Sequence, residues 1–123
     1  MSIVPDLMGL GLPAALAERL GNSVATAAAA ASSSQTGATV ITQHVMLFTA
    51  ATGANSAIFA TAASIGTPHW ITNSTASAVA LLVYCPVSGS MNQTANGNLS
   101  IATGKTAVFV QNGQSTWVSI LTA

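Results

Sequence analysis

The sequence predicts a mainly β fold, a β-sandwich or jelly-roll-like module preceded by an N-terminal extended arm and a short helix. Short runs of β-branched and aromatic residues recur from Thr39 onward, and clusters of Gly, Asn, Ser and Thr separate them, which is typical of brief strands joined by tight turns. The first twelve residues are also apolar, but Pro5, Gly9 and Gly11 interrupt them. We therefore divide the chain into an arm and short helix (1–21), an Ala/Ser-rich linker (22–38) and the β-module (39–123).

The N-terminal helix is expected to begin at Pro13, because a missing N–H costs nothing at the first helical position. Leu12, Leu16 and Leu20 recur at helical spacing, and Gly21 is the expected C-terminal stop. A helix of barely two turns is not stable alone in water. It must therefore dock, either on its own β-domain or in a groove of a partner protein. The side chains available for that contact are Leu7, Met8, Leu10, Leu12, Leu16 and Leu20.

The segment after the helix, residues 22–37, reads NSVATAAAAASSSQTG and is low in complexity. Alanine favours helix, whereas the three serines at 32–34 and Gly37 favour an ending or a linker. We expect a flexible tether. The alternative is that these small side chains let three chains approach closely around an axis.

The β-module is expected to contain seven strands, at residues 39–48, 56–61, 69–73, 78–84, 99–102, 106–110 and 116–121. The run at 78–84 is the most apolar, which predicts a central strand buried on both faces. Asn112-Gly113, between the last two strands, is a strong signal for a hairpin turn.

The β-core is expected to hold Trp70, Val83, Tyr84, Phe109 and Trp117. Large aromatic side chains dominate the packing energy of a core, so they are placed beneath the sheet. The alternative for the two tryptophans is an exposed platform on which a sugar ring stacks, as in a receptor-binding module.

Charge is nearly absent from the chain. Its 123 residues fit one domain with some left over for an arm, yet only 3% are charged, against roughly a quarter in ordinary soluble domains. The formal net charge is zero, and Lys105 is the only formally charged side chain after Gly21. The solvated surface must therefore consist of hydroxyls and amides, and we expect much of it to be covered by other protein.

This composition argues against two classes of partner. Arg19 and Lys105 are the only cations, too few to neutralise the phosphates of a nucleic acid. The mean hydropathy of +0.60 is high, but the strongest apolar run is far shorter than the roughly 20 residues of a membrane span. The N-terminus lacks the basic residues of a signal peptide, so we expect neither secretion nor a membrane anchor. A single cysteine, Cys85, excludes an internal disulfide and fits assembly in a reducing cytoplasm.

Catalytic chemistry is also not expected. Asp6 and Glu18 are the only carboxylates, and both lie outside the β-module, which argues against paired acid–base catalysis. His44, His69 and Cys85 fall short of a four-ligand zinc site within one chain. A thiol at the end of an apolar strand is expected to be buried and inert. We therefore expect no enzyme and no cofactor; the remaining alternatives are a Cys–His enzyme and a histidine cluster on a trimer axis.

A resemblance to a known family appears in the second half of the module. The run Ile71–Asn73, the stretch from Val83 to Val110 and Trp117 resemble a β-module of small tailed-bacteriophage virion proteins. The matching positions are Asn73, Val83, Tyr84, Pro86, Gly89, Met91, Asn92, Gly104, Ala107, Phe109 and Trp117. Cys85, inserted before the proline, departs from the pattern and affects the shape of that turn.

The N-terminal PDLMGLGLPAALAERLG is similar to the capsid-proximal segments of phage head-fibre and decoration proteins. Together the two resemblances imply a capsid decoration (cement) protein, or alternatively a head- or tail-fibre adaptor or receptor-binding module. They imply a homotrimer that binds the major capsid protein on the virion surface after assembly in the host cytoplasm.

Overall fold

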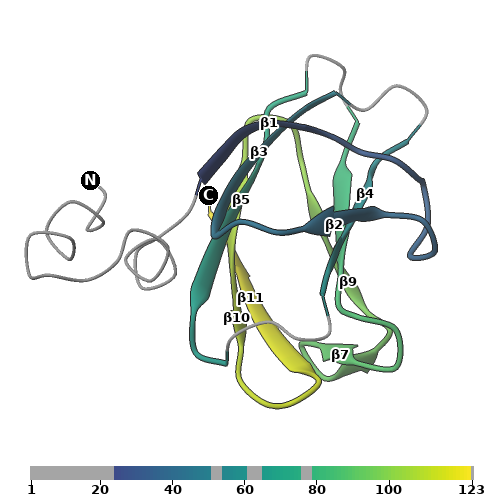
Figure 1. Cartoon of the computed structure of the whole chain (residues 1–123), viewed down its shortest axis with the longest axis vertical. Coiled ribbons are helices and arrows are strands. Elements are labelled where there is room, and N and C mark those ends of the chain that lie inside the picture. Colours follow the sequence, from purple (N-terminus) through teal and green to yellow (C-terminus); the bar gives the residue numbers. More distant parts are fainter. Residues whose placement is uncertain (1–23, 51–53, 61–64, 76–78, 123) are drawn as a thin grey trace, which may run out of the picture.

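The computed structural model describes residues 24–50, 54–60, 65–75 and 79–122 (Figure 1). Within these ranges the chain consists of strands and turns, which confirms the predicted mainly β fold. The predicted arm and helix at residues 1–21 lie outside the described residues. The described part contains no helix long and apolar enough to cross a membrane.

Eleven strands occur in the described part of the chain. They are β1 (Val24–Ala29), β2 (Thr39–Ile41), β3 (Val45–Ala50), β4 (Ser56–Phe59), β5 (Pro68–Asn73), β6 (Leu81–Tyr84), β7 (Ser90–Met91), β8 (Thr94–Ala95), β9 (Asn98–Ile101), β10 (Thr106–Gln111) and β11 (Thr116–Leu121).

The strands form two sheets that enclose one core. The large sheet has seven strands in the order β1-β3-β5-β10-β11-β7-β8, and the small sheet has four in the order β2-β4-β6-β9. From β1 to β6 the chain alternates between the sheets, so that odd strands enter the large sheet and even strands the small one (Figure 1). Each of β3 to β6 pairs in parallel with the strand two before it. In the first half of the module the chain therefore winds back and forth between the two sheets. Each pair of parallel strands is connected through a strand of the opposite sheet, which serves as the crossover that parallel pairing requires.

The second half of the module adds antiparallel strands to both sheets. Strand β9 pairs with β6 in the small sheet, while β10 pairs with β5 and then with β11 in the large sheet. The topology is thus a two-sheet sandwich with mixed pairing, and its parallel neighbours distinguish it from an antiparallel jelly roll.

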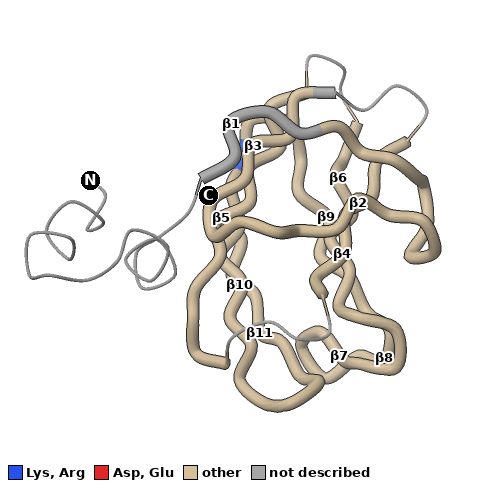
Figure 2. Tube along the Cα trace, viewed as in Figure 1, with Lys and Arg blue, Asp and Glu red and all other residues tan. Residues whose placement is uncertain are grey.

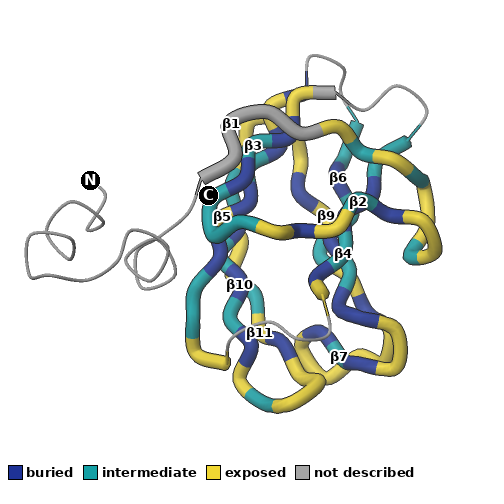
Figure 3. Tube along the Cα trace, in the orientation of Figure 1, coloured by how far each residue is buried: buried dark blue, intermediate teal, exposed yellow. Residues whose placement is uncertain are grey.

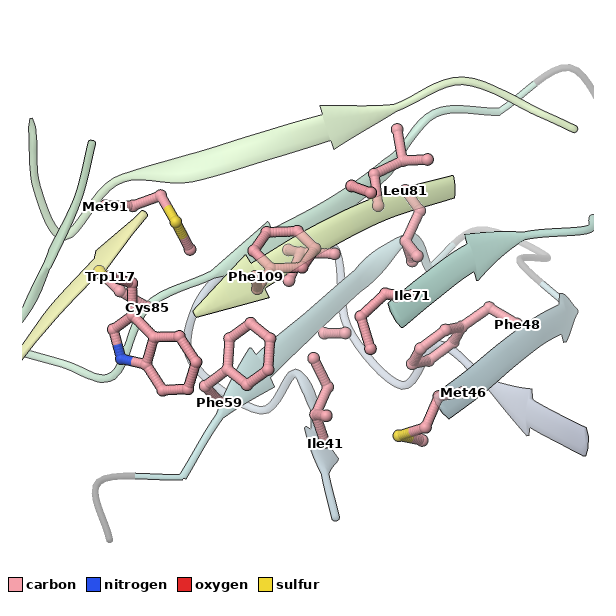
Figure 4. Close-up of a cluster of buried hydrophobic side chains, with 14 residues drawn as sticks. Ile41, Met46, Phe48, Phe59, Ile71, Leu81, Cys85, Met91, Phe109 and Trp117 are labelled. Carbon is pink, nitrogen blue, oxygen red and sulfur yellow. The ribbon is translucent and has the colours of Figure 1, made fainter. Parts of the chain in front are cut away.

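The core lies between the sheets and is built from alternate residues of nearly every strand (Figure 4). In β10 the inward positions are buried and the outward ones half-buried, as expected for a sheet with one face on the core. Phe59 of β4 stacks on Trp117 of β11, with ring centroids 4.1 Å apart and planes 19° from parallel. This aromatic pair joins the small sheet to the large one.

Two expectations from the sequence are wrong, one about a strand and one about the linker. The predicted strand at 39–48 is two strands, β2 and β3, which lie in different sheets. Residues 42–44 turn the chain between them, and the carbonyl of His44 accepts a 2.7 Å hydrogen bond from the Trp70 N–H. The predicted linker at 22–38 also contains β1, which pairs with β3 at the edge of the large sheet.

The strand at 78–84 also differs from the expectation. The observed strand β6 lies inside the small sheet, but only Leu81 and Val83 are buried, whereas Leu82 and Tyr84 are half-buried. Only one face of the small sheet packs on the core, so its other face cannot be fully buried. The predicted hairpin between β10 and β11 is present, with a loop that begins after the pair of Gln111 with Trp117.

Candidate interaction surface

The face of the large sheet that points away from the core is apolar. Met46, Ile71, Ala107, Phe109 and Trp117 are buried on the inner side of β3, β5, β10 and β11. Successive side chains of a strand point to opposite faces, so the residues between them form the opposite side. We call this side the outer face and define it by Val45, Leu47, Pro68, Trp70, Val108, Val110, Val118 and Ile120.

Strand register places these residues side by side. One row of directly paired residues crosses four strands and consists of Val45, Trp70, Val108 and Ile120. The adjacent row consists of Pro68, Val110 and Val118. Directly opposite residues have Cβ atoms about 4.5–5.5 Å apart, so the two rows form one continuous apolar surface.

Three residues of this surface are exposed and the other five are half-buried. Ile120 is 73% exposed, Val118 41% and Trp70 37%. Figure 3 shows the alternation of buried and more accessible positions along β5 and β10 that produces it. A sheet face in contact with water normally carries polar residues. The largest apolar patch on a protein surface is often functional, which makes the outer face the candidate interaction surface.

Hydroxyl groups border the apolar rows. At one end Thr72 and Thr106 are paired across the strands, with their Oγ1 atoms 2.7 Å apart, and the Thr122 Oγ1 donates a 2.6 Å hydrogen bond to the Thr106 carbonyl. At the other end Thr116 is paired with Ser90. An apolar centre with a polar border is the usual anatomy of a protein–protein interface.

Charge is absent from the outer face. Among the described residues Lys105 carries the only charged side chain, at the turn that leads into β10 (Figure 2). The border of the outer face consists mainly of threonine and serine, and Lys105 beside Thr106 is the one described residue near it that could form an ion pair.

The predicted core residues do not all lie in the core. Val83, Phe109 and Trp117 are fully buried, and Tyr84 is half-buried. The placement of Trp70 in the core is wrong, because His69 and Ile71 occupy the inward positions of β5 and leave Trp70 on the outer face. The predicted partner-binding side chains of residues 7–20 lie outside the described residues.

A signal for the outer face was present in the sequence. Strands β10 and β11 are apolar at both odd and even positions, as in TAVFV and TWVSIL. Such runs indicate a strand covered on both faces. The expectation applied this rule only to residues 78–84, and so missed the strands whose second face is the apolar one.

His69 is a buried polar residue that packs against aromatic rings inside the sandwich. The His69 ring lies 5.1 Å from the His44 ring and 5.8 Å from that of Trp117, measured between centroids. Burial lowers the pKa of His69 from its ordinary value of 6.5, the backbone carbonyl of Gln43 opposes this shift, and nearby His44 adds to it. The lowered pKa favours the neutral form of His69.

Cys85 lies in the core with no exposed surface. Burial raises the pKa of its thiol above the ordinary value, which disfavours the reactive thiolate. Its backbone N–H donates to the Gly97 carbonyl at 3.1 Å, and its own carbonyl accepts from the Gln35 Nε2 at 2.9 Å. Within the described ranges no three His, Cys, Asp or Glu side chains gather as metal ligands.

Comparison with protein-family models, with curated proteins and with solved structures finds no match to this chain.

Proposed function

We propose that this chain is a structural protein of a tailed-phage virion, a decoration protein that binds and stabilises the capsid as a homotrimer. The observation that carries the proposal is the uncharged apolar outer face, which would be costly to leave in water. It is supported by the near-absence of charge and by the resemblance of residues 71–117 to phage virion modules.

The proposed mechanism is mechanical and involves no catalysis. Residues 1–21 attach the protein to the major capsid protein, and the β-modules hold neighbouring copies together. Each leucine of the predicted stripe, Leu12, Leu16 and Leu20, would contribute roughly 1.5–3 kcal/mol when buried, before the cost of ordering the segment. One trimer then links several capsid subunits, so capsid opening must also break these contacts.

Binding to purified empty capsids of its phage tests this function. The parent protein should raise the melting temperature of the capsid, and Leu16→Asp should abolish this effect by placing a charge in the buried stripe. Glu18→Gln, on the other side of the predicted helix, should bind like the parent. Unchanged binding after deletion of residues 1–21 would show that the β-module carries the attachment site.

The exposed indole of Trp70 favours a second candidate, a head- or tail-fibre adaptor or receptor-binding module. Its flat ring within an apolar row could stack against a sugar. An adaptor would bind the virion without raising the melting temperature of the capsid. Glycan binding that is lost in Trp70→Ala and retained in Tyr84→Ala would support this alternative.

A further inference from the structure

We infer that copies of this chain associate through the outer face of the large sheet, with Trp70, Val108 and Ile120 at the centre of the contact. The inference rests on the trimer proposed above and names the surface that forms it. Its test requires no capsid, so it stands or fails separately from the decoration function.

The absence of charge identifies a second copy as the occupant. A partner of ordinary composition would bring several charged side chains onto this face, where the single Lys105 beside Thr106 is the only charge of the described residues, so their desolvation would be largely uncompensated. A second outer face brings only valine, isoleucine, proline, tryptophan and hydroxyl groups. The formal net charge of zero also means that copies do not repel each other at a distance.

The size of the face suits the centre of such an interface. Four strands about 4.8 Å apart and about 17–20 Å long cover roughly 350 Å² of plane. A typical interface buries about 800 Å² on each partner, with an apolar core and a polar rim. The threonine and serine border supplies part of that rim.

The strand geometry supports sheet-on-sheet packing between copies. The inner side of the same sheet already packs on another sheet through alternating apolar residues. The outer face has the same alternation, two adjacent apolar rows and no charged side chain across β3, β5, β10 and β11. It can therefore form a second, intermolecular core when two or three such faces meet around a symmetry axis.

Sedimentation equilibrium of the full chain at micromolar concentration tests the inference. The parent should sediment as an oligomer of the 12.2 kDa chain, and Ile120→Lys should sediment as the monomer. The matched control is Val40→Lys, since Val40 is 49% exposed on the outer side of the small sheet and should leave the oligomer intact. Circular dichroism establishes that each variant is folded, and the milder Ile120→Thr replaces Ile120→Lys if the latter unfolds.

Tryptophan fluorescence supplies a second measurement. Trp117 is buried within the chain, so only Trp70 should change its environment on association. The emission of the Ile120→Lys monomer should lie at longer wavelength than that of the parent oligomer, and Val40→Lys should match the parent.

Two results would overturn the inference. One is a monomeric parent protein. If, in addition, residues 1–21 are needed to shield Trp70 from a soluble quencher, the outer face is covered by the N-terminal segment of the same chain. The other is an oligomer that is unchanged in Ile120→Lys. A monomeric parent that still stabilises capsids would defeat this inference and the proposed homotrimer but would leave capsid stabilisation standing, and an oligomer that ignores capsids would defeat the decoration function alone.

Discussion

At the residue scale, Asn73 links the two sheets through its side chain. Its Nδ2 donates to the carbonyls of Val79 and Ile101, both at 2.8 Å, and its Oδ1 accepts from the Oγ1 and N–H of Thr75 at 2.8 and 3.2 Å. Asn73 belongs to β5 of the large sheet, whereas Ile101 belongs to β9 of the small sheet. Every polar atom of this buried amide is therefore used.

Asn73→Asp should destabilise the fold strongly although the side chain keeps its shape. The change removes both N–H donors and places a carboxylate oxygen opposite two buried carbonyl groups. Each buried carbonyl left without a hydrogen-bond donor costs about 1–3 kcal/mol of stability. Chemical denaturation should show a loss of at least about 2 kcal/mol. Asn92→Asp is the matched control, because Asn92 is exposed and bonded to Ser119, whose hydroxyl and N–H can both donate to a carboxylate. Equal losses in the two variants would contradict the role assigned to Asn73.

Trp117→Ala should cost about 3–5 kcal/mol, close to the whole stability of a small domain. The indole is 1% exposed and stacks on Phe59, so its removal leaves a cavity between the sheets. Thermal melting checks this. Tyr84→Phe is the control: it removes only the hydroxyl of a half-buried side chain and should melt close to the parent. A Trp117→Ala protein that melts like the parent would refute the packing described for this residue.

Stability should fall as the pH drops below about 6.5, because of His69. Burial lowers the pKa of His69 in the folded chain, so below its ordinary pKa the unfolded chain binds a proton that the folded chain does not. The contribution is present above that pH and is lost as the pH falls toward the lowered folded pKa.

Denaturation at about pH 7.5 and about pH 5 measures this dependence. His69→Gln should remove most of it, and the control His44→Gln should retain most of it, because burial is the largest cause of the His69 shift and His44 the smallest. His44 and His69 are the only histidines, and neither an aspartate nor a glutamate occurs among the described residues, so few other groups contribute in this range. A slope that survives in His69→Gln would assign the effect elsewhere.

At the element scale, β1 is the strand that composition conceals. Its sequence is VATAAA, and alanine has low preference for strands. Pairing with β3 nevertheless holds it in the large sheet. The chain that follows is fixed by Ser56, whose Oγ lies 2.6 Å from the Ser32 carbonyl and 2.8 Å from that of Ser34. Tertiary pairing thus decides the structure of a segment whose composition indicates a tether.

Two truncations distinguish a structural strand from a tether. Removal of residues 1–21 should leave the melting temperature of the β-module nearly unchanged, since no described strand is lost. Removal of residues 1–36 should lower it substantially, because β1 and the bonds to Ser56 disappear and the edge of β3 is exposed. Equal melting temperatures for the two truncated proteins would mean that β1 contributes nothing to stability.

At the scale of the whole molecule, uncharged composition and sheet topology have one shared consequence. Because the strands alternate between the two sheets, the inner sides of both sheets pack on one common core. The large sheet is apolar on its inner and on its outer side. With one charged side chain in the described part, the self-association that we propose must depend on apolar contact and hydroxyl groups.

Association should therefore be nearly independent of ionic strength. The association constant should change by less than about twofold between about 20 mM and about 500 mM NaCl, because screening acts on charges and few are present. Ammonium sulfate should strengthen it, since excluded salts favour the burial of apolar surface. Sedimentation in the two NaCl buffers provides the measurement, and a steep dependence on NaCl would indicate ion pairs at the interface.

The sequence predicted the parts of this protein that depend on neighbouring residues. The alternation of apolar residues located strands near 56, 69, 99, 106 and 116, and Asn112-Gly113 located the hairpin. The burial of Val83, Phe109 and Trp117 also followed from the size and polarity of these side chains. The low charge also led us to expect a surface covered by other protein, and this stays a prediction.

Strand partners and the direction of each face were decided only by the tertiary structure. A period of two shows that His69 and Ile71 share one side and that Trp70 lies on the other, but either side could be the inner one. Pairing of β5 with β3 and β10, from distant parts of the chain, turns Trp70 outward. The same applies to the run at 39–48, which divides between two sheets, and to β1, which is held by β3. Which side of a strand meets the core is set by contacts between residues far apart in sequence, and a local pattern carries no information about them.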